Sequence, residues 1–345
     1  MPDPPSTLRS LHSHMIVGRM AATPLPEREH LTICFAHVAY RLGERFALRN
    51  TGIRCFELRT LHELEARIGA ADVLVVSGLW RNELLDRAKS LRFIQSISAG
   101  TDQYAREALR ARGIRLASAQ GANEGAVAEH AMALMLALAR QLPQARDNQA
   151  RRHWRAMISD PALREDELAG KTLLIVGLGR IGSRLAALAS GFGMRVIATK
   201  RNPAVAADAA ELVAAQDRLL GLLPQADFVA LTCPLTPQTE LLFGAAAFAA
   251  IKPSAFLVNV ARGRVVDEPA LIRALQEGRI AGAALDCFWD EPLPADSPLW
   301  TFPNVLVTPH SAGETRRYED NVIDLLLENL GRLWRGEDEL KNQIV

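Results

Sequence analysis

Short apolar segments alternate along the chain with segments of helical periodicity. Between the apolar segments lie stretches with apolar residues at helical spacing, such as Leu61–Ile68 and Asn82–Ala88. This alternation is typical of βαβ units, whose parallel strands are buried on both faces by helices. The strands predicted from the apolar segments are Leu31–Val38, Val73–Ser77, Phe93–Ser98, Thr172–Gly177, Met194–Thr199, Phe228–Thr232, Ala255–Val260, Ala281–Asp286 and Val305–Thr308.

The predicted strands fall into two groups, which indicates two α/β domains. A long helical stretch rich in Ala, Leu and Met, Asn123–Arg140, separates the groups. The last predicted helix, Glu314–Leu333, carries one apolar stripe, and we expect it to pack back on the first group. We therefore predict a smaller flavodoxin-like α/β substrate-binding domain of residues 31–120 plus 312–345. A Rossmann-type cofactor domain with a doubly wound parallel sheet, residues 121–311, is inserted in it.

Residues 1–30 differ from the rest of the chain. They include five prolines and show no sustained periodicity, so we expect a mobile N-terminal tail. The stretch has no apolar core after a basic start, so we expect no secretory signal. His12 and His14 have no third candidate ligand nearby, and we expect no metal site.

Composition narrows the classes of function. The 345 residues suit two domains, and 49% apolar with 23% charged residues is typical of globular proteins. A net charge of +1 gives no concentrated basic surface for nucleic acid or membranes, and the apolar runs are too short to span a bilayer. The four cysteines are widely spaced, which indicates buried thiols in a reducing compartment, and we expect a cytoplasmic protein. They are Cys34, Cys55, Cys233 and Cys287.

A glycine-rich motif connects the predicted strand Thr172–Gly177 to a helix. Gly177, Gly179 and Gly182 form the pattern G-x-G-x-x-G, with Arg180 and Ile181 between the last two glycines. In this context the glycines permit a tight turn, a close approach of pyrophosphate and close packing of the helix. The following helix N-terminus attracts phosphate, so the motif predicts a dinucleotide site.

The end of the next predicted strand bears on which dinucleotide binds. An acid usually hydrogen-bonds the ribose of NAD about 20 residues after the glycine loop. Here Thr199, Lys200 and Arg201 occupy this region, and the nearest acid is Asp208. A hydroxyl and two cations favour the 2′-phosphate of NADP over NAD, although a solvated basic turn would show the same residues.

Three candidate catalytic residues follow three later strands. Arg262, Glu291 and His310 each come after a predicted strand end, where open α/β sheets bind ligands. Arg can bind a carboxylate through two hydrogen bonds, His can exchange a proton near neutral pH, and a Glu can stabilise the imidazolium. Together they supply what the reduction of a 2-keto acid needs besides a hydride.

At these residues the sequence resembles the D-isomer-specific 2-hydroxyacid dehydrogenases, and in particular the glyoxylate/hydroxypyruvate reductase-like members. The resemblance runs from about Leu31 to Leu333 and leaves the tail outside. The segments that carry it are Ser98–Asp102, Gly121–His130, Glu167–Lys171, Gly177–Gly182, Cys233–Thr239, Asn259–Leu271, Ala284–Pro294 and Thr308–His310.

The resemblance implies a role for each candidate. It implies that Arg262 binds the substrate carboxylate and keto oxygen, that His310 is the general acid/base, and that Glu291 is the partner of His310. The backbone of Ala99 and Gly100 would take the carboxylate from the other domain. Asp286 would contact the nicotinamide amide, and Cys233 and Pro234 would line the cofactor cleft. The cofactor contacts expected in full are Gly177, Gly179, Arg180, Ile181, Gly182, Thr199, Lys200, Arg201, Cys233, Pro234, Val260 and Asp286.

Several alternatives stay open at this point. A phosphite dehydrogenase-like enzyme would keep Arg262, Glu291 and His310, whereas formate dehydrogenases carry glutamine in place of Glu291. A dinucleotide-sensing corepressor without turnover is a further alternative, which the presence of all three residues disfavours. Trp80 could wall the substrate pocket and Arg81 could bind a second anionic group, or both could be structural. Because the chain ends at Val345, we expect no C-terminal regulatory domain of the kind found in phosphoglycerate dehydrogenases. The resemblance also suggests a homodimer through the cofactor domain and Asn123–Arg140, whose apolar residues cover much of its circumference.

Overall fold

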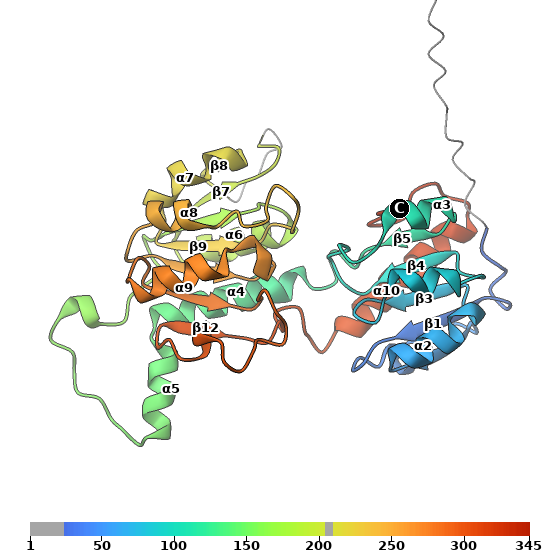
Figure 1. Cartoon of the computed structure of the whole chain (residues 1–345), viewed down its shortest axis with the longest axis horizontal. Coiled ribbons are helices and arrows are strands. Elements are labelled where there is room, and N and C mark those ends of the chain that lie inside the picture. The colour runs from blue at the N-terminus through green and yellow to red at the C-terminus, as the bar shows by residue number, and fades with distance from the viewer. Residues whose placement is uncertain (1–23, 204–209) are drawn as a thin grey trace, which may run out of the picture.

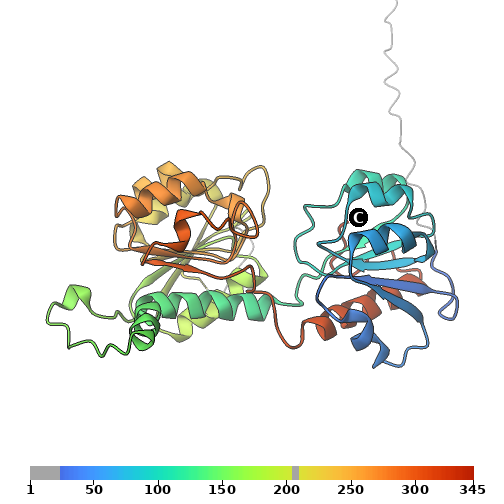
Figure 2. The same cartoon turned by 60° about the horizontal axis from the view of Figure 1, so that its bottom comes forward.

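Two parallel sheets organise the chain in the computed structural model, which describes residues 24–203 and 210–345. They form two α/β lobes that are separate in both views (Figures 1 and 2). The α/β class expected from the sequence is confirmed. None of the helices in these two described ranges combines the length and the apolar character that a membrane crossing requires.

The smaller sheet has the strand order β2-β1-β3-β4-β5 with every pair parallel. Its central strands β3 and β4 are buried throughout, as expected when helices cover both faces. The strands are β1 (Thr32–Ala36), β2 (Arg54–Leu58), β3 (Val73–Val76), β4 (Phe93–Ser96) and β5 (Arg115–Ala117).

The helices of this lobe come from both ends of the chain. They are α1 (Leu42–Ala47), α2 (Leu61–Arg67), α3 (Arg106–Ala111) and α10 (Tyr318–Trp334). The C-terminal helix α10 contacts α1, and its residues Val322, Leu326 and Leu330 join Phe35 and Phe46 in one core. The returning helix expected from the sequence is thus confirmed, although it begins at Tyr318 rather than at Glu314.

The larger sheet has the strand order β12-β11-β10-β9-β6-β7-β8. The chain builds one half from β6 outwards and then crosses to β9, so the order reverses between β6 and β9. Open α/β sheets bind ligands in the crevice at such a reversal. The strands are β6 (Thr172–Val176), β7 (Arg195–Thr199), β8 (Leu212–Ala214), β9 (Phe228–Leu231), β10 (Phe256–Asn259), β11 (Gly282–Leu285) and β12 (Val305–Val307).

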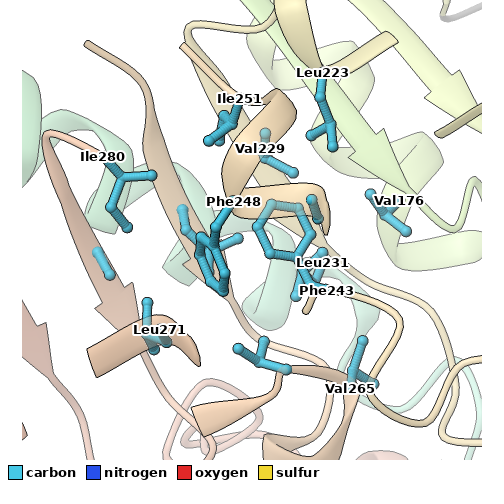
Figure 3. Close-up of a cluster of buried hydrophobic side chains, with 14 of the residues drawn as sticks. Val176, Leu223, Val229, Leu231, Phe243, Phe248, Ile251, Val265, Leu271 and Ile280 are labelled. Atoms are coloured by element: carbon cyan, nitrogen blue, oxygen red, sulfur yellow. The ribbon is translucent and has the colours of Figure 1, made fainter. Parts of the chain in front are cut away.

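Helices cover both faces of this sheet with two separate cores. One core includes Phe243 and Phe248, whose rings meet edge to face with centroids 4.9 Å apart (Figure 3). On the other face α4 packs against α6, β10 and β11, and Figure 2 shows it running below the sheet. The helices are α4 (Glu124–Ala139), α6 (Arg180–Gly191), α7 (Leu219–Leu222), α8 (Ala245–Ala250) and α9 (Glu268–Gln276).

An arm extends from the cofactor lobe after α4. It consists of α5 (Leu142–Ala150) and the segment that leads back to β6, and both views show it projecting away from the rest of the chain (Figures 1 and 2). No residue of α5 is buried, and Trp154 and Met157 are each 96% exposed. Large apolar side chains are therefore displayed on the arm.

The predicted N-terminal tail is only partly described. Residues 1–23, which include His12 and His14, lie outside the described residues. The oxygen of Pro24 accepts a hydrogen bond from Arg92, and that of Pro26 accepts one from the Trp334 indole at 2.9 Å. Residues directly before β1 thus lie against the smaller lobe.

Candidate active site

His310 and Glu291 form a hydrogen-bonded pair. The His310 Nδ1 lies 2.8 Å from the Glu291 Oε2, and the other carboxylate oxygen accepts the Phe288 N–H at 3.0 Å. Because the carboxylate only accepts, the shared proton belongs on Nδ1 of His310. The Nε2 of the same ring is then left for a second partner.

The surroundings of the pair favour its charged form. Hydrogen bonding with Cys287 and with Glu291 raises the pKa of His310 to about 10, against the opposing effect of burial. Although burial acts in the other direction, the hydrogen bond with His310 holds the pKa of Glu291 below its ordinary value. The structure therefore holds an imidazolium opposite a carboxylate at neutral pH, which is the protonation state of a general acid.

Asp286 positions the loop that carries His310. Its carboxylate, 1% exposed, accepts the Thr308 hydroxyl at 2.6 Å, the Ser311 N–H at 2.9 Å and the Ala312 N–H at 3.1 Å. These bonds lie on both sides of His310, whose φ of 53° is unusual for a residue other than glycine. The bonds hold the backbone in this conformation, and the expected contact of Asp286 with a nicotinamide amide stays a prediction.

His130 extends this network from helix α4. Its Nε2 lies 3.1 Å from the Thr308 Oγ1 and 3.6 Å from an Asp286 oxygen. Since Thr308 already donates its hydrogen to Asp286, His130 must donate from Nε2. Sequence reasoning gave His130 and Thr308 no role of their own, because only the fold brings α4 to the end of β12.

Arg262 lies where the two lobes meet. The Arg262 guanidinium lies where a Cβ atom of residue 100 would stand, so Gly100 leaves room for this close approach. Asn259 shapes the loop, since its amide donates to the Arg262 oxygen at 3.1 Å and its oxygen accepts the Ala261 N–H at 3.0 Å. The structure thus brings Arg262 to the Ala99–Gly100 segment, as the expected carboxylate site requires.

The glycine loop has the shape of a pyrophosphate site. Gly177 has a φ of +102°, and an added Cβ would lie 2.6 Å from the Cys233 Cα. A Cβ on Gly182 would lie 2.6 Å from the Gly177 oxygen, whereas one on Gly179 would meet no atom within 4 Å. The first and third glycines are therefore needed for packing, and the second faces open space at the start of α6, as a bound phosphate requires.

The residues expected at the adenosine end follow β7. The Thr199 hydroxyl is fully buried and has no hydrogen-bond partner among the described residues, while Arg201 is exposed and Lys200 is half-buried. Because the Thr199 hydroxyl is wholly buried and turned away from solvent, Lys200 and Arg201 are the residues on which the prediction of a 2′-phosphate site rests. Asp208 lies outside the described residues.

The other expected cofactor residues have varied surroundings. Cys233 and Val260 are buried in the cores on opposite faces of the sheet, and Ile181 packs on the same core as Val260. The Arg180 guanidinium lies beside Gly121 in the connection between the lobes. Pro234 follows Cys233, whose backbone lies against Gly177, so the turn adjoins the glycine loop.

The two candidates in the smaller lobe are both bonded to groups of their own segment. Trp80 is 2% exposed, stacks at a tilt on Tyr104 and donates from its indole to the Asn82 Oδ1 at 3.0 Å. Arg81 donates to the backbone oxygens of Gly78 and Trp80 at 2.9 and 2.7 Å. Trp80 is thus a core residue of this lobe, and the Arg81 guanidinium is bound to the backbone of its own loop.

Cys287 is a further residue of the site that the sequence did not assign. Its thiol is 3% exposed and donates to the Ala261 oxygen at 3.5 Å. Burial raises the pKa of this thiol, although His310 acts in the opposite direction. The cysteine thus helps to hold Ala261 and adjoins the imidazole, and its position directly after Asp286 was the only signal for it.

Comparison with known proteins identifies the family. The model of the NAD binding domain of D-isomer specific 2-hydroxyacid dehydrogenases matches residues 132–312. The chain belongs to this family. It is accordingly an oxidoreductase that transfers a hydride between a nicotinamide dinucleotide and a 2-keto or 2-hydroxy acid.

Individual relatives agree with this assignment. The chain is 41% identical to glyoxylate/hydroxypyruvate reductase B of Yersinia pseudotuberculosis over 270 residues, 78% of this chain and 82% of the relative. It is 38% identical to D-3-phosphoglycerate dehydrogenase of Methanocaldococcus jannaschii over 282 residues, 81% of this chain but only 52% of that longer relative. The structure resembles NADPH-dependent glyoxylate/hydroxypyruvate reductase of Sinorhizobium meliloti, solved with NADP and malonate. That match has a TM-score of 0.77 and 28% identity, and covers 92% of this chain and 97% of the other.

Proposed function

We propose that this dehydrogenase reduces small 2-keto acids, with Arg262 as the carboxylate anchor and the His310–Glu291 pair as the acid/base. The observation that carries the proposal is the 2.8 Å hydrogen bond between the His310 Nδ1 and the Glu291 carboxylate. The similarity to relatives named glyoxylate/hydroxypyruvate reductase B supports a small substrate.

The chain's own residues supply everything except the hydride. The Arg262 guanidinium and the backbone of Ala99 and Gly100 bind the carboxylate and orient the keto carbon. His310 donates its Nε2 proton to the keto oxygen as the carbon accepts the hydride, which gives the 2-hydroxy acid and a neutral imidazole. A reduced nicotinamide supplies that hydride when it is bound. Glu291 stabilises the imidazolium before this transfer and holds the ring afterwards.

The experiment that tests the proposal is a cofactor oxidation assay with glyoxylate, hydroxypyruvate, pyruvate and bulkier 2-keto acids. We expect turnover of the small acids, and we expect His310→Ala to lower kcat by about 10²–10⁴-fold while cofactor affinity survives. Near-wild-type turnover by His310→Ala would reject the assigned acid. Cofactor binding without any turnover by the wild-type chain would instead support a dinucleotide sensor, and oxidation of phosphite would support the phosphite dehydrogenase alternative.

We propose NADPH as the preferred cofactor. Lys200 and Arg201 follow β7 where the adenosine ribose of a dinucleotide lies in this fold, and residues 194–203 contain no acid that would repel a 2′-phosphate. The structurally similar Sinorhizobium meliloti reductase, described as NADPH-dependent, supports the same choice.

We propose that the chain forms a homodimer through its arm. The arm presents Trp154 and Met157, each 96% exposed, together with Leu142 and Leu163. Exposed apolar residues gathered on one projection are typical of an interaction site. Helix α4, on which the sequence argument for a dimer rested, is largely buried by its own chain against α6, β10 and β11.

A cytoplasmic location remains a prediction from the cysteine pattern.

A further inference from the structure

Two serine hydroxyls meet at the edge of the smaller sheet. Ser77 directly follows β3 and Ser98 comes two residues after β4, and these strands are parallel neighbours. Their Oγ atoms lie 2.6 Å apart. Both side chains are half-buried, so the pair reaches the surface of the lobe.

The hydrogen-bond partners of this pair leave one hydrogen over. Two hydroxyls carry two hydrogens, and the bond between Ser77 and Ser98 uses one of them. The Gln103 Nε2 donates to the Ser77 Oγ at 3.2 Å, which occupies a lone pair and consumes no hydroxyl hydrogen. Among residues 24–203 and 210–345, no other group accepts from either hydroxyl. One hydroxyl hydrogen of the pair is therefore available to a ligand.

The spare hydrogen lies beside the proposed carboxylate site. Ser98 directly precedes Ala99 and Gly100, and Gly100 is in close approach to the Arg262 guanidinium. A keto acid whose carboxylate is held there places the carbon after the keto group within a few bonds of the anchor. Ser98 therefore adjoins the anchor segment on one side, while Thr101 on the other side is buried and its hydroxyl accepts a hydrogen bond from Arg106 at 3.2 Å.

The charges nearby favour a neutral ligand group. The nearest cation on this loop, Arg81, is folded onto the oxygens of Gly78 and Trp80. Asp102 is exposed two residues beyond Gly100 and would repel a second anion. Trp80 is buried in the core of the smaller lobe and offers no apolar wall to a ligand. A donor hydrogen without an added cation suits an uncharged oxygen.

We propose that the Ser77–Ser98 pair is a specificity site that binds a hydroxyl oxygen on C3 of the 2-keto acid. This inference rests on the function proposed above and names the substrate class of that site. It makes hydroxypyruvate a better substrate than pyruvate, which differs from it only by the missing C3 hydroxyl. An oxygen that pairs with the spare hydrogen adds binding energy that a methyl group does not.

The test compares kcat/KM for hydroxypyruvate, pyruvate and glyoxylate in the wild type and in Ser98→Ala and Ser77→Ala. Each variant should lower the hydroxypyruvate-to-pyruvate ratio roughly three- to tenfold, the equivalent of one net hydrogen bond. Glyoxylate has no C3, so its kcat/KM should stay within about twofold in both variants. Ser118→Ala is the matched control, because Ser118 follows β5 at the same sheet edge and, within the described part of the chain, its hydroxyl accepts only the Gln120 N–H at 3.5 Å.

Gln103→Glu tests the hydrogen count with both serines in place. A carboxylate cannot donate, so it would accept the Ser77 hydrogen, and Ser98 would then donate to Ser77. No hydrogen would remain for the ligand, and the hydroxypyruvate-to-pyruvate ratio should fall as it does in Ser98→Ala. The added negative charge should lower kcat/KM for all three acids. This common loss cancels in the hydroxypyruvate-to-pyruvate ratio.

The outcomes separate this inference from the function on which it rests. A wild-type chain that reduces none of the three acids would overturn the proposed function. Turnover of glyoxylate with an unchanged hydroxypyruvate-to-pyruvate ratio in the serine variants would overturn the serine assignment alone. Equal losses for all three acids in Ser77→Ala and Ser98→Ala would also overturn it, since they would show damage to the carboxylate loop.

Discussion

His310 adopts a backbone conformation that few residues other than glycine tolerate. A left-handed φ of this kind costs on the order of 1–3 kcal/mol, and it persists only where the surroundings enforce it. Here the enforcement comes from Asp286, whose bonds to Thr308 and Ser311 lie on either side of the histidine. This conformational cost is consistent with a role in which the orientation of the His310 imidazole is required for proton transfer.

The first residue-scale prediction concerns pH. Reduction needs the imidazolium, so kcat/KM for reduction should be level below the pKa of His310 and fall as the pH rises through it. Glu291→Gln removes the anion that helps to raise this pKa, so the falling limb should move to lower pH. Profiles measured from about pH 6 to about pH 11 would show the shift.

The neighbouring Asp290 provides the control for this measurement. It is an exposed acid next to Glu291, and Asp290→Asn removes the same charge without touching the hydrogen bond to His310. We expect its profile to match the wild type. Equal shifts in both variants would indicate a general field effect, and no shift in Glu291→Gln would contradict the pairing.

Arg262 carries the second residue-scale prediction. Arg262→Ala should lower kcat/KM for keto acids by roughly 10²–10⁴-fold, because two charge-assisted hydrogen bonds to the carboxylate are lost. Arg262→Lys should recover only part of this, since an ammonium group lacks the planar fork. Titration of the cofactor alone should give an unchanged Kd in both variants.

Arg264 lies in the same loop and serves as the control for Arg262. Its guanidinium is exposed and lies over the Trp289 ring, 5.3 Å from the centroid. Arg264→Ala should leave kcat/KM close to the wild type. If it were as damaging as Arg262→Ala, the loss would come from disturbance of the loop and not from the anchor.

Individual site residues were most predictable from the sequence where a reactive or binding side chain directly follows a predicted strand. The glycines of the loop and the set of Arg262, Glu291 and His310 follow strand ends, so their meeting at one sheet edge was predictable. The inward turn of Trp80 was not, because it depends on Tyr104 and Asn82 from other segments. The hydrogen bonds of Asp286, Thr308 and His130 around His310 were not predictable for the same reason.

At the scale of elements, the buried parallel strands were the most predictable. All five residues of β6 are buried, and a continuous apolar run marks such a strand. The short strand β8 is exposed or half-buried, and α5 has no buried residue, so neither has an apolar pattern to detect. The stretch Asn82–Ala88 was expected to be helical, and the structure has a 3₁₀ helix over Asn82–Asp86.

The end of β7 carries the element-scale prediction. Lys200→Ala combined with Arg201→Ala should raise KM for NADPH far more than KM for NADH. Charge-assisted bonds to the 2′-phosphate should give the wild type roughly 10–10³-fold preference, and the double variant should lose most of it. High salt should narrow the wild-type preference, because it screens exposed charges.

Arg195 at the opposite end of β7 is the control for this measurement. It is bonded to Glu211 at 3.1 Å, away from the strand end that faces the glycine loop. Arg195→Ala should leave the ratio of KM for NADH to KM for NADPH unchanged. Equal kcat/KM for NADPH and NADH in the wild type at low salt would refute the assignment.

At the scale of the whole molecule, the chain leaves the smaller lobe, builds the larger one and returns. The returning helix α10 is bonded to the outgoing connection, since the Asn321 amide donates to the Ala122 oxygen at 2.8 Å. This arrangement places the Ala99–Gly100 segment of one lobe against Arg262 of the other. The returning helix α10 was visible in the sequence as an apolar stripe, whereas the projecting arm was not.

The arm leads to the last prediction. Trp154 and Met157 would expose their full apolar surface to water in a monomer, and burying such side chains stabilises by about 1.5–3 kcal/mol each. We expect sedimentation at micromolar concentration to give twice the chain mass of 37.7 kDa. Trp154→Glu combined with Met157→Glu should shift the protein to the monomer, because the charges would have to be buried in the contact. Leu48→Glu, at a position 66% exposed in the smaller lobe, should leave the dimer intact. A wild-type monomer, or a double variant that still sediments as a dimer, would exclude the arm as the interface.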